Sequence, residues 1–128
     1  MAGALSVIGD VYKTQVYKLA GYLNRDRIVI PEHTIVKPPS AELRPGQKDS
    51  DSLPEYELLD SVLFQYIENE KSTEQIVALG FDEPLVRRVV QLVDRAEFKR
   101  FQAPPILRVS SKAFGAGRVM PLVARYPG

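Results

Sequence analysis

The chain has 128 residues, of which 45% are hydrophobic, and a formal net charge of only +1, which fits a single domain with a modest core rather than a strongly basic nucleic-acid binder. It contains no apolar run of the roughly 18 residues that span a bilayer, and its first nine residues lack the features of a secretory signal. Without cysteine and with one histidine, it offers no disulfide, thiol nucleophile or zinc cluster, so we expect a cytoplasmic protein without a membrane segment.

The first predicted helix covers residues 11–24, where Val16, Leu19 and Leu23 fall on one face at helical spacing and Asp10 can cap the N-terminus. Lys13 lies in its first turn, where an ammonium group and exposed backbone N–H groups can face the same anion. A solvated surface lysine is the alternative for this residue.

Residues 31–53 are predicted to form a stiff loop. Five of the ten prolines lie between Pro31 and Pro54, which argues against a regular helix and leaves only short extended pieces. Lys37 and Arg44 bring positive charge, and Gly46 supplies a hinge. The composition predicts a lid loop that closes over an anionic ligand.

Three further helices are predicted, over residues 53–69, 73–79 and 83–101. The first two open with capping boxes that start at Ser52 and Ser72, and the third follows Asp82. Gly80 ends the middle helix and the tail, residues 102–128, is irregular. The chain is therefore predicted to be mainly α, with about four helices, a proline-rich loop and an irregular tail.

Charge is divided unevenly along the chain. Residues 49–83 hold ten acidic residues and one lysine, whereas residues 85–125 hold nine basic residues and two acidic ones. Such a division is typical of two solvated faces, and it can also steer an anionic ligand toward the basic half. Both readings stay open from the sequence.

Residues 72–102 also fit a helix-turn-helix DNA-binding module, with a turn at Gly80 and arginines such as Arg87 and Arg88 on the longer helix. The acidic residues around the shorter helix would repel phosphates, which argues against it. A module that serves only structure or interactions is a third possibility.

Four blocks connect the chain to a known family. They read GDVYKTQVYKLA at residues 9–20, KPPSAELRPGQKDSDSLPEY at 37–56, RAEFKRFQAPP at 95–105 and KAFGAGRVMPLVARY at 112–126. In this order they resemble the C-terminal part of NAD synthetase, and more its glutamine-dependent branch than its ammonia-only one. The resemblance implies that residues 1–128 are the C-terminal portion of a Rossmann-like α/β fold, that of adenine-nucleotide α-hydrolases and PP-loop ATP pyrophosphatases.

The resemblance also implies site residues. Lys13 and Ser40 match positions that contact ATP, and Phe98 and Lys99 match the pair that contacts deamido-NAD. The lid positions are Lys37, Glu42 and Arg44. Asp49 and Asp51 are candidate ligands for Mg²⁺, although acidic residues just before a helix more often stabilise its N-terminus. No catalytic side chain is assigned, and His33 is expected at the surface or in a packed loop.

The implied enzyme is an ATP-dependent carbon–nitrogen ligase of NAD biosynthesis. ATP adenylates the nicotinate carboxylate of deamido-NAD, and ammonia, free or from glutamine, then displaces AMP. The family's pyrophosphate-binding loop is absent from these residues. We therefore expect a fragment that needs the N-terminal part of the same protein, is inactive alone and forms homo-oligomers, with no nucleic acid as partner.

Overall fold

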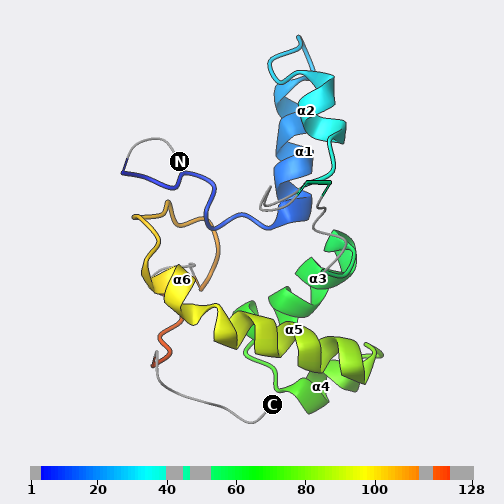
Figure 1. Cartoon of the computed structure of the whole chain (residues 1–128), viewed down its shortest axis with the longest axis vertical. Helices are drawn as coiled ribbons and strands as arrows, with labels where there is room; N and C mark the ends of the chain where they lie inside the picture. Colours follow the sequence, from blue (N-terminus) through cyan, green and yellow to red (C-terminus); the bar gives the residue numbers. More distant parts are fainter. Residues whose placement is uncertain (1–3, 40–44, 47–52, 113–116, 122–128) are drawn as a thin grey trace. The chain divides into compact units, whose positions relative to one another are not determined.

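The computed structural model describes residues 4–39, 45–46, 53–112 and 117–121 (Figure 1). These residues form helices and connecting segments without a strand, and one isolated parallel bridge joins Ser6 to Ile106. The chain divides into two compact units: Met1–Val11 with Ser61–Gly128, and Tyr12–Asp60. None of the helices in the described part is long and apolar enough to cross a membrane.

In the unit Tyr12–Asp60, α1 covers Lys13–Leu23, slightly shorter than predicted. The Asn24 side chain closes the turn that follows it. Its Oδ1 accepts from the N–H groups of Val29 and Ile30 at 3.0 and 2.9 Å, and its Nδ2 donates to the Ile30 carbonyl at 2.8 Å. A single amide side chain thus fixes the turn that leads from α1 to the next helix.

The second helix, α2, covers Glu32–Val36 and corrects the prediction that the lid loop holds no helix. Pro31 precedes it with a φ of −56°, which suits a helix start, because the missing N–H of proline is not needed there. Lys37 ends it in an extended conformation, as a residue before Pro38 must. The prolines therefore delimit a one-turn helix instead of excluding it.

α3 covers Tyr56–Leu63 and continues into the π-helical turn η2, Phe64–Glu68, which ends where the N–H of Asn69 donates to the Phe64 carbonyl at 3.2 Å. The predicted start near residue 53 is wrong, because Leu53 and Pro54 lie outside the helix. The widened turn adds one residue to the helical register, so side chains after residue 63 point in new directions.

α4 covers Thr73–Val77 and α5 covers Glu83–Arg95. The predicted capping box at Ser72 is confirmed, since its hydroxyl accepts from the Gln75 N–H at 3.3 Å and its own N–H donates to Gln75 Oε1 at 2.9 Å. The Asp82 carboxylate caps α5 through the Leu85 N–H at 3.0 Å. Between the helices Gly80 has a φ of +97°, a conformation that glycine adopts without strain.

The long helix predicted over residues 83–101 is wrong in one respect: it is interrupted. α5 ends at Arg95, Ala96 adopts φ −89° and ψ 4°, and α6 begins at Glu97 and ends at Phe101. The sequence at this point contains neither proline nor glycine, so no local signal announces the break.

The apolar core of the other unit, Met1–Val11 with Ser61–Gly128, is small. α4 packs against α5 (Figure 1), and η2 also contacts α4. The buried hydrophobic side chains here are Val62, Ile76, Val86, Val89 and Val90. This cluster fixes the direction of α5 and thereby the position of α6.

Replacing Ile76 with alanine should lower the free energy of unfolding by about 2–5 kcal/mol, because this fully buried side chain would leave a cavity between α4 and α5. Urea unfolding followed by circular dichroism measures the change. Leu79→Ala is the matched control, since Leu79 is 53% exposed and its loss should cost far less. Equal losses at the two positions would contradict the packing described.

Candidate functional site

Lys13 is the first residue of α1 and is held between two aromatic rings. Its ammonium nitrogen lies 5.7 Å from the ring centroid of Tyr17 and 5.7 Å from that of Tyr56. Both distances are within the range of cation–π attraction. Lys13 is half-buried. It is therefore not the solvated surface lysine that is the alternative interpretation of the sequence.

The N-terminus of α1 already has an internal anion. The Thr14 N–H donates to Asp60 Oδ2 at 2.8 Å, and Asp60 is buried. The expectation that this helix end presents open N–H groups is therefore wrong for Thr14. An anion that binds beside Lys13 would be attracted by the lysine ammonium rather than by the Thr14 N–H.

Asp10 does not cap α1, contrary to the prediction. Its carboxylate accepts from the backbone N–H groups of Val109 and Ser110 at 2.8 and 2.7 Å, and from the Ser110 hydroxyl at 2.9 Å. Close by, the Ser6 N–H donates to the Pro105 carbonyl at 2.9 Å. These bonds tie the N-terminal segment to the tail, a pairing of residues about one hundred positions apart.

Phe98 and Lys99 both belong to α6 and are exposed to solvent. The Lys99 ammonium lies 6.0 Å from the Phe98 ring centroid. The structure thus brings these two predicted residues together on one short helix and leaves an aromatic ring and a cation accessible side by side.

The residues on the inner side of α6 form an ion-pair network. Glu97 is only 4% exposed, and its carboxylate accepts from Arg100 Nε at 2.9 Å and lies 3.9 Å from Arg118. The hydrogen bond from Arg100 lowers the pKa of the Glu97 carboxyl, outweighing burial, which acts in the opposite direction. Glu97 therefore stays ionised to a lower pH than an ordinary glutamate.

The same arginine of the tail reaches back to α5. Arg118 Nη2 donates to Asp94 Oδ1 at 2.9 Å and to the Tyr66 hydroxyl at 3.1 Å, and the Tyr66 hydroxyl donates to Asp94 at 3.0 Å. Burial, followed by the charge of Asp94, raises the pKa of Tyr66. Tyr66 is thus kept as a protonated donor at neutral pH.

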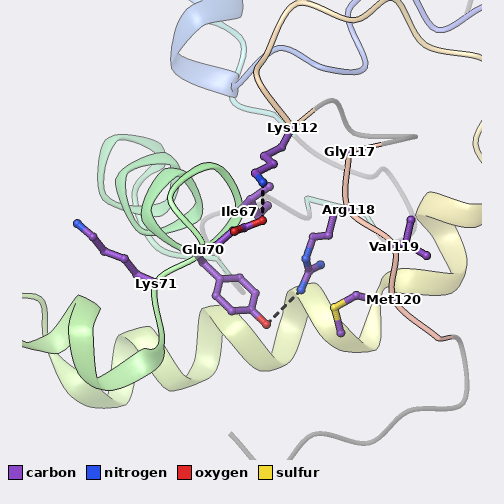
Figure 2. A pocket seen from close by; sticks show the side chains of 9 residues that line it. Ile67, Glu70, Lys71, Lys112, Gly117, Arg118, Val119 and Met120 are labelled. Carbon is purple, nitrogen blue, oxygen red and sulfur yellow. Dashed lines mark hydrogen bonds and ion pairs between the residues drawn. The ribbon is translucent and has the colours of Figure 1, made fainter.

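A pocket with a volume of about 320 Å³ lies between η2 and the tail (Figure 2). Figure 2 shows Lys112 reaching toward Glu70, with which it forms an ion pair, and Arg118 pointing toward α5. The pocket is lined by Tyr66, Ile67, Glu70, Lys71, Lys112, Gly117, Arg118, Val119 and Met120. Neither Phe98 nor Lys99, the residues predicted for deamido-NAD, lines it, and no pattern in the sequence indicates it.

Several predicted residues cannot be placed. Ser40, Glu42, Arg44, Asp49 and Asp51 lie outside the described residues. Lys37 is described and is exposed at the end of α2. In the described part of the chain, no group of three or more potential metal-ligating side chains gathers.

The chain matches one known protein family over most of its length. The family model described as NAD synthase matches residues 1–103, and the chain belongs to that family. Its relatives include glutamine-dependent NAD(+) synthetases from Synechocystis sp., 47% identical over 98% of this chain, and from Acinetobacter baylyi, 51% identical over 96%.

A solved structure supports the same relationship. The glutamine-dependent NAD+ synthetase from Acinetobacter baumannii in complex with ADP matches 89% of this chain at 40% identity with a TM-score of 0.55. The match takes in 19% of that chain, and each of the two relatives above is matched over 23% of its own length. The chain thus spans less than a quarter of the proteins it resembles. None of these relatives supports the helix-turn-helix hypothesis, although α4 and α5 do form a helix pair.

Replacing Glu97 with glutamine should lower the free energy of unfolding at neutral pH by about 1.5–3 kcal/mol, because a charged hydrogen-bond acceptor for Arg100 is lost. The folded-state pKa of Glu97 lies below its ordinary value of 4.5, so its contribution is present above that value and lost as the pH falls through the folded-state pKa. The difference between wild type and variant should therefore shrink in acid. Urea unfolding across a pH series measures it.

Glu83→Gln is the control for this pH series. Glu83 pairs with Arg87 at 2.9 Å on the exposed surface of α5, where an ion pair contributes little. A gap between wild type and Glu97→Gln that stayed constant from neutral to strongly acid pH would contradict the role given to the Glu97 charge.

Proposed function

We propose that this chain is the C-terminal part of the synthetase domain of a glutamine-dependent NAD synthetase, with the Rossmann-like PP-loop fold completed by the rest of that protein. The observation that carries the proposal is the match of nearly the whole chain to enzymes of that name at 47% and 51% identity. The enzyme is cytoplasmic and acts in NAD biosynthesis.

The reaction requires activation, since a carboxylate is a poor electrophile. A nicotinate carboxylate oxygen of deamido-NAD attacks the α-phosphorus of ATP and pyrophosphate leaves, which gives an acyl adenylate. Ammonia then attacks the carbonyl carbon and AMP departs with the electrons of the broken C–O bond. The protein contributes mainly by positioning the reactants and by stabilising charge on the phosphates.

Lys13 is assigned to the ATP phosphates. Its ammonium lies between the Tyr17 and Tyr56 rings, and among the described residues it forms no salt bridge with a carboxylate. Its charge is therefore not neutralised by an ion pair within that part of the chain. Two rings that restrict the lysine side chain also reduce the conformational entropy lost when it binds a phosphate.

Phe98 and Lys99 are assigned to deamido-NAD. This substrate carries aromatic rings and an anionic pyrophosphate, and the exposed ring and ammonium on α6 match both features. Stacking and charge pairing supply affinity without any catalytic side chain. The relative from Acinetobacter baumannii was solved with ADP, which supports an adenine nucleotide as ligand of this fold.

The remaining assignments concern residues around this core function. Ser40 joins Lys13 at ATP, and Lys37, Glu42 and Arg44 belong to the lid loop. Mg²⁺ would accompany ATP, with Asp49 and Asp51 as candidate ligands.

Glutamine supplies the ammonia in an N-terminal domain of the same protein. The complete enzyme forms homo-oligomers through apolar surface such as that around Ile28, which is 81% exposed.

In the complete synthetase, Lys13→Ala should lower kcat/KM for ATP about ten- to a hundredfold, because a charge-assisted contact of 1.5–3 kcal/mol is lost. Lys99→Ala should do the same for deamido-NAD, and each variant should spare the other substrate. Steady-state kinetics with one substrate saturating measures both. Lys18→Ala, an exposed lysine on α1, is the control; a Lys13 variant that behaves like it would refute the ATP assignment.

The 128 residues alone should not form NAD. The purified chain is incubated with deamido-NAD, ATP, Mg²⁺ and ammonia, and NAD is measured by a coupled dehydrogenase assay. The reason is that no pyrophosphate-binding loop occurs in this sequence to hold the leaving group. Turnover above that of a boiled sample would disprove the expectation.

A further inference from the structure

The break between α5 and α6 has no cause in its own sequence. The Ala96 N–H still donates to the carbonyls of Leu92 and Val93 at 3.1 Å, and the Lys99 N–H donates to the Ala96 carbonyl at 2.9 Å. The backbone is thus a helix that tightens and turns at one alanine. Since kinks in helices have identifiable causes, and neither proline nor glycine is present, tertiary contacts must hold this one.

Arg118 supplies those contacts from the tail. It donates to Asp94, near the end of α5, at 2.9 Å and lies 3.9 Å from Glu97, the first residue of α6. Arg118 therefore pairs with a carboxylate on each side of Ala96. Its own side chain is only 16% exposed, so water competes little for these bonds.

We infer that Arg118 is a positioning residue for deamido-NAD: by fixing the angle between α5 and α6 it sets the direction in which Phe98 and Lys99 face the substrate. The inference rests on the proposed function. Five residues are too few for a helix that is stable alone, so the orientation of α6 depends on what its inner side contacts. Glu97 points inward to the arginines, and the next two residues are exposed.

The lining of the pocket in Figure 2 agrees with this role for the arginine. Arg118 stands between Gly117 and Val119, and its guanidinium also lies 4.9 Å from the Tyr66 ring centroid. Tyr66 and Asp94 therefore restrict the guanidinium from two sides. These contacts restrict the guanidinium independently of its contact with Glu97.

A double-mutant cycle in the complete synthetase tests the inference, with Arg118→Ala, Lys99→Ala and the double variant. Arg118→Ala should lower kcat/KM for deamido-NAD about tenfold and leave kcat/KM for ATP unchanged. In the Lys99→Ala background the same change should have little further effect, because the group that it positions is gone. Arg87→Ala, which removes an exposed ion pair of α5, should leave both values unchanged.

If Arg118 only stabilised the fold, Arg118→Ala would lower kcat/KM for ATP as well as for deamido-NAD, or would lower kcat/KM for deamido-NAD by the same factor with and without Lys99→Ala. Either result overturns the inference. If Arg118→Ala does not fold, Arg118→Lys replaces it in the cycle. Lysine keeps the charge but not the fork that reaches two carboxylates, so a smaller loss with the same dependence on Lys99 is expected.

The two possible failures are distinguishable. If Lys99→Ala leaves kcat/KM for deamido-NAD unchanged, the site assignment of the proposed function fails and the inference fails with it. If Lys99→Ala is impaired and Arg118→Ala is not, or the two effects multiply, only the inference fails.

Discussion

The ionic contacts of Arg118 hold the tail, α5 and α6 in one arrangement. Taking charges out of water is unfavourable, and such a group is stable only where its hydrogen-bonding capacity is well satisfied. That condition is met, since no buried side-chain nitrogen or oxygen in the described residues lacks a partner. The apolar core near α4 and α5 fixes one end of α5, and the charged network fixes the other. Removing one charge from the network therefore leaves a partly buried partner with fewer polar contacts.

Local features of this chain could be predicted from the sequence, because their partners lie within a few residues. The capping box at Ser72, the cap at Asp82 and the positive φ of Gly80 are of this kind. Family membership was also accessible, because four separate blocks of residues carry the resemblance.

The misplaced residues have distant partners. Asp10, which the sequence predicts as a helix cap, binds Ser110 instead, and the carboxylate bound to the Thr14 N–H comes from Asp60. The break at Ala96 depends in the same way on an arginine from the tail. Of the candidate site, the pairing of Phe98 with Lys99 followed from sequence, whereas the network beneath them did not.

Part of the charge that is divided unevenly along the sequence is neutralised by ion pairs within the fold. Lys112 from the basic half pairs with Glu70 from the acidic half. The Ser111 hydroxyl donates to Glu68 in the same region, at the end of η2. The sequence alone left open whether the basic residues form a solvated face or attract a ligand. For Lys112 and Arg118 of the tail the structure gives a third answer, since both pair with carboxylates of other segments.

The ion pairs within the fold distinguish Lys99 from the arginines Arg100 and Arg118. A lysine or arginine with a carboxylate partner presents little net charge to an incoming anion, and separating such a pair on binding would cost free energy. Lys99 has an aromatic ring as its neighbour, and no salt bridge in the described ranges involves it. An anion close to α6 would therefore meet a positive charge at Lys99, while Arg100 pairs with Glu97 and Arg118 pairs with Asp94. The arrangement separates the cation that can bind from the cations that hold it in place.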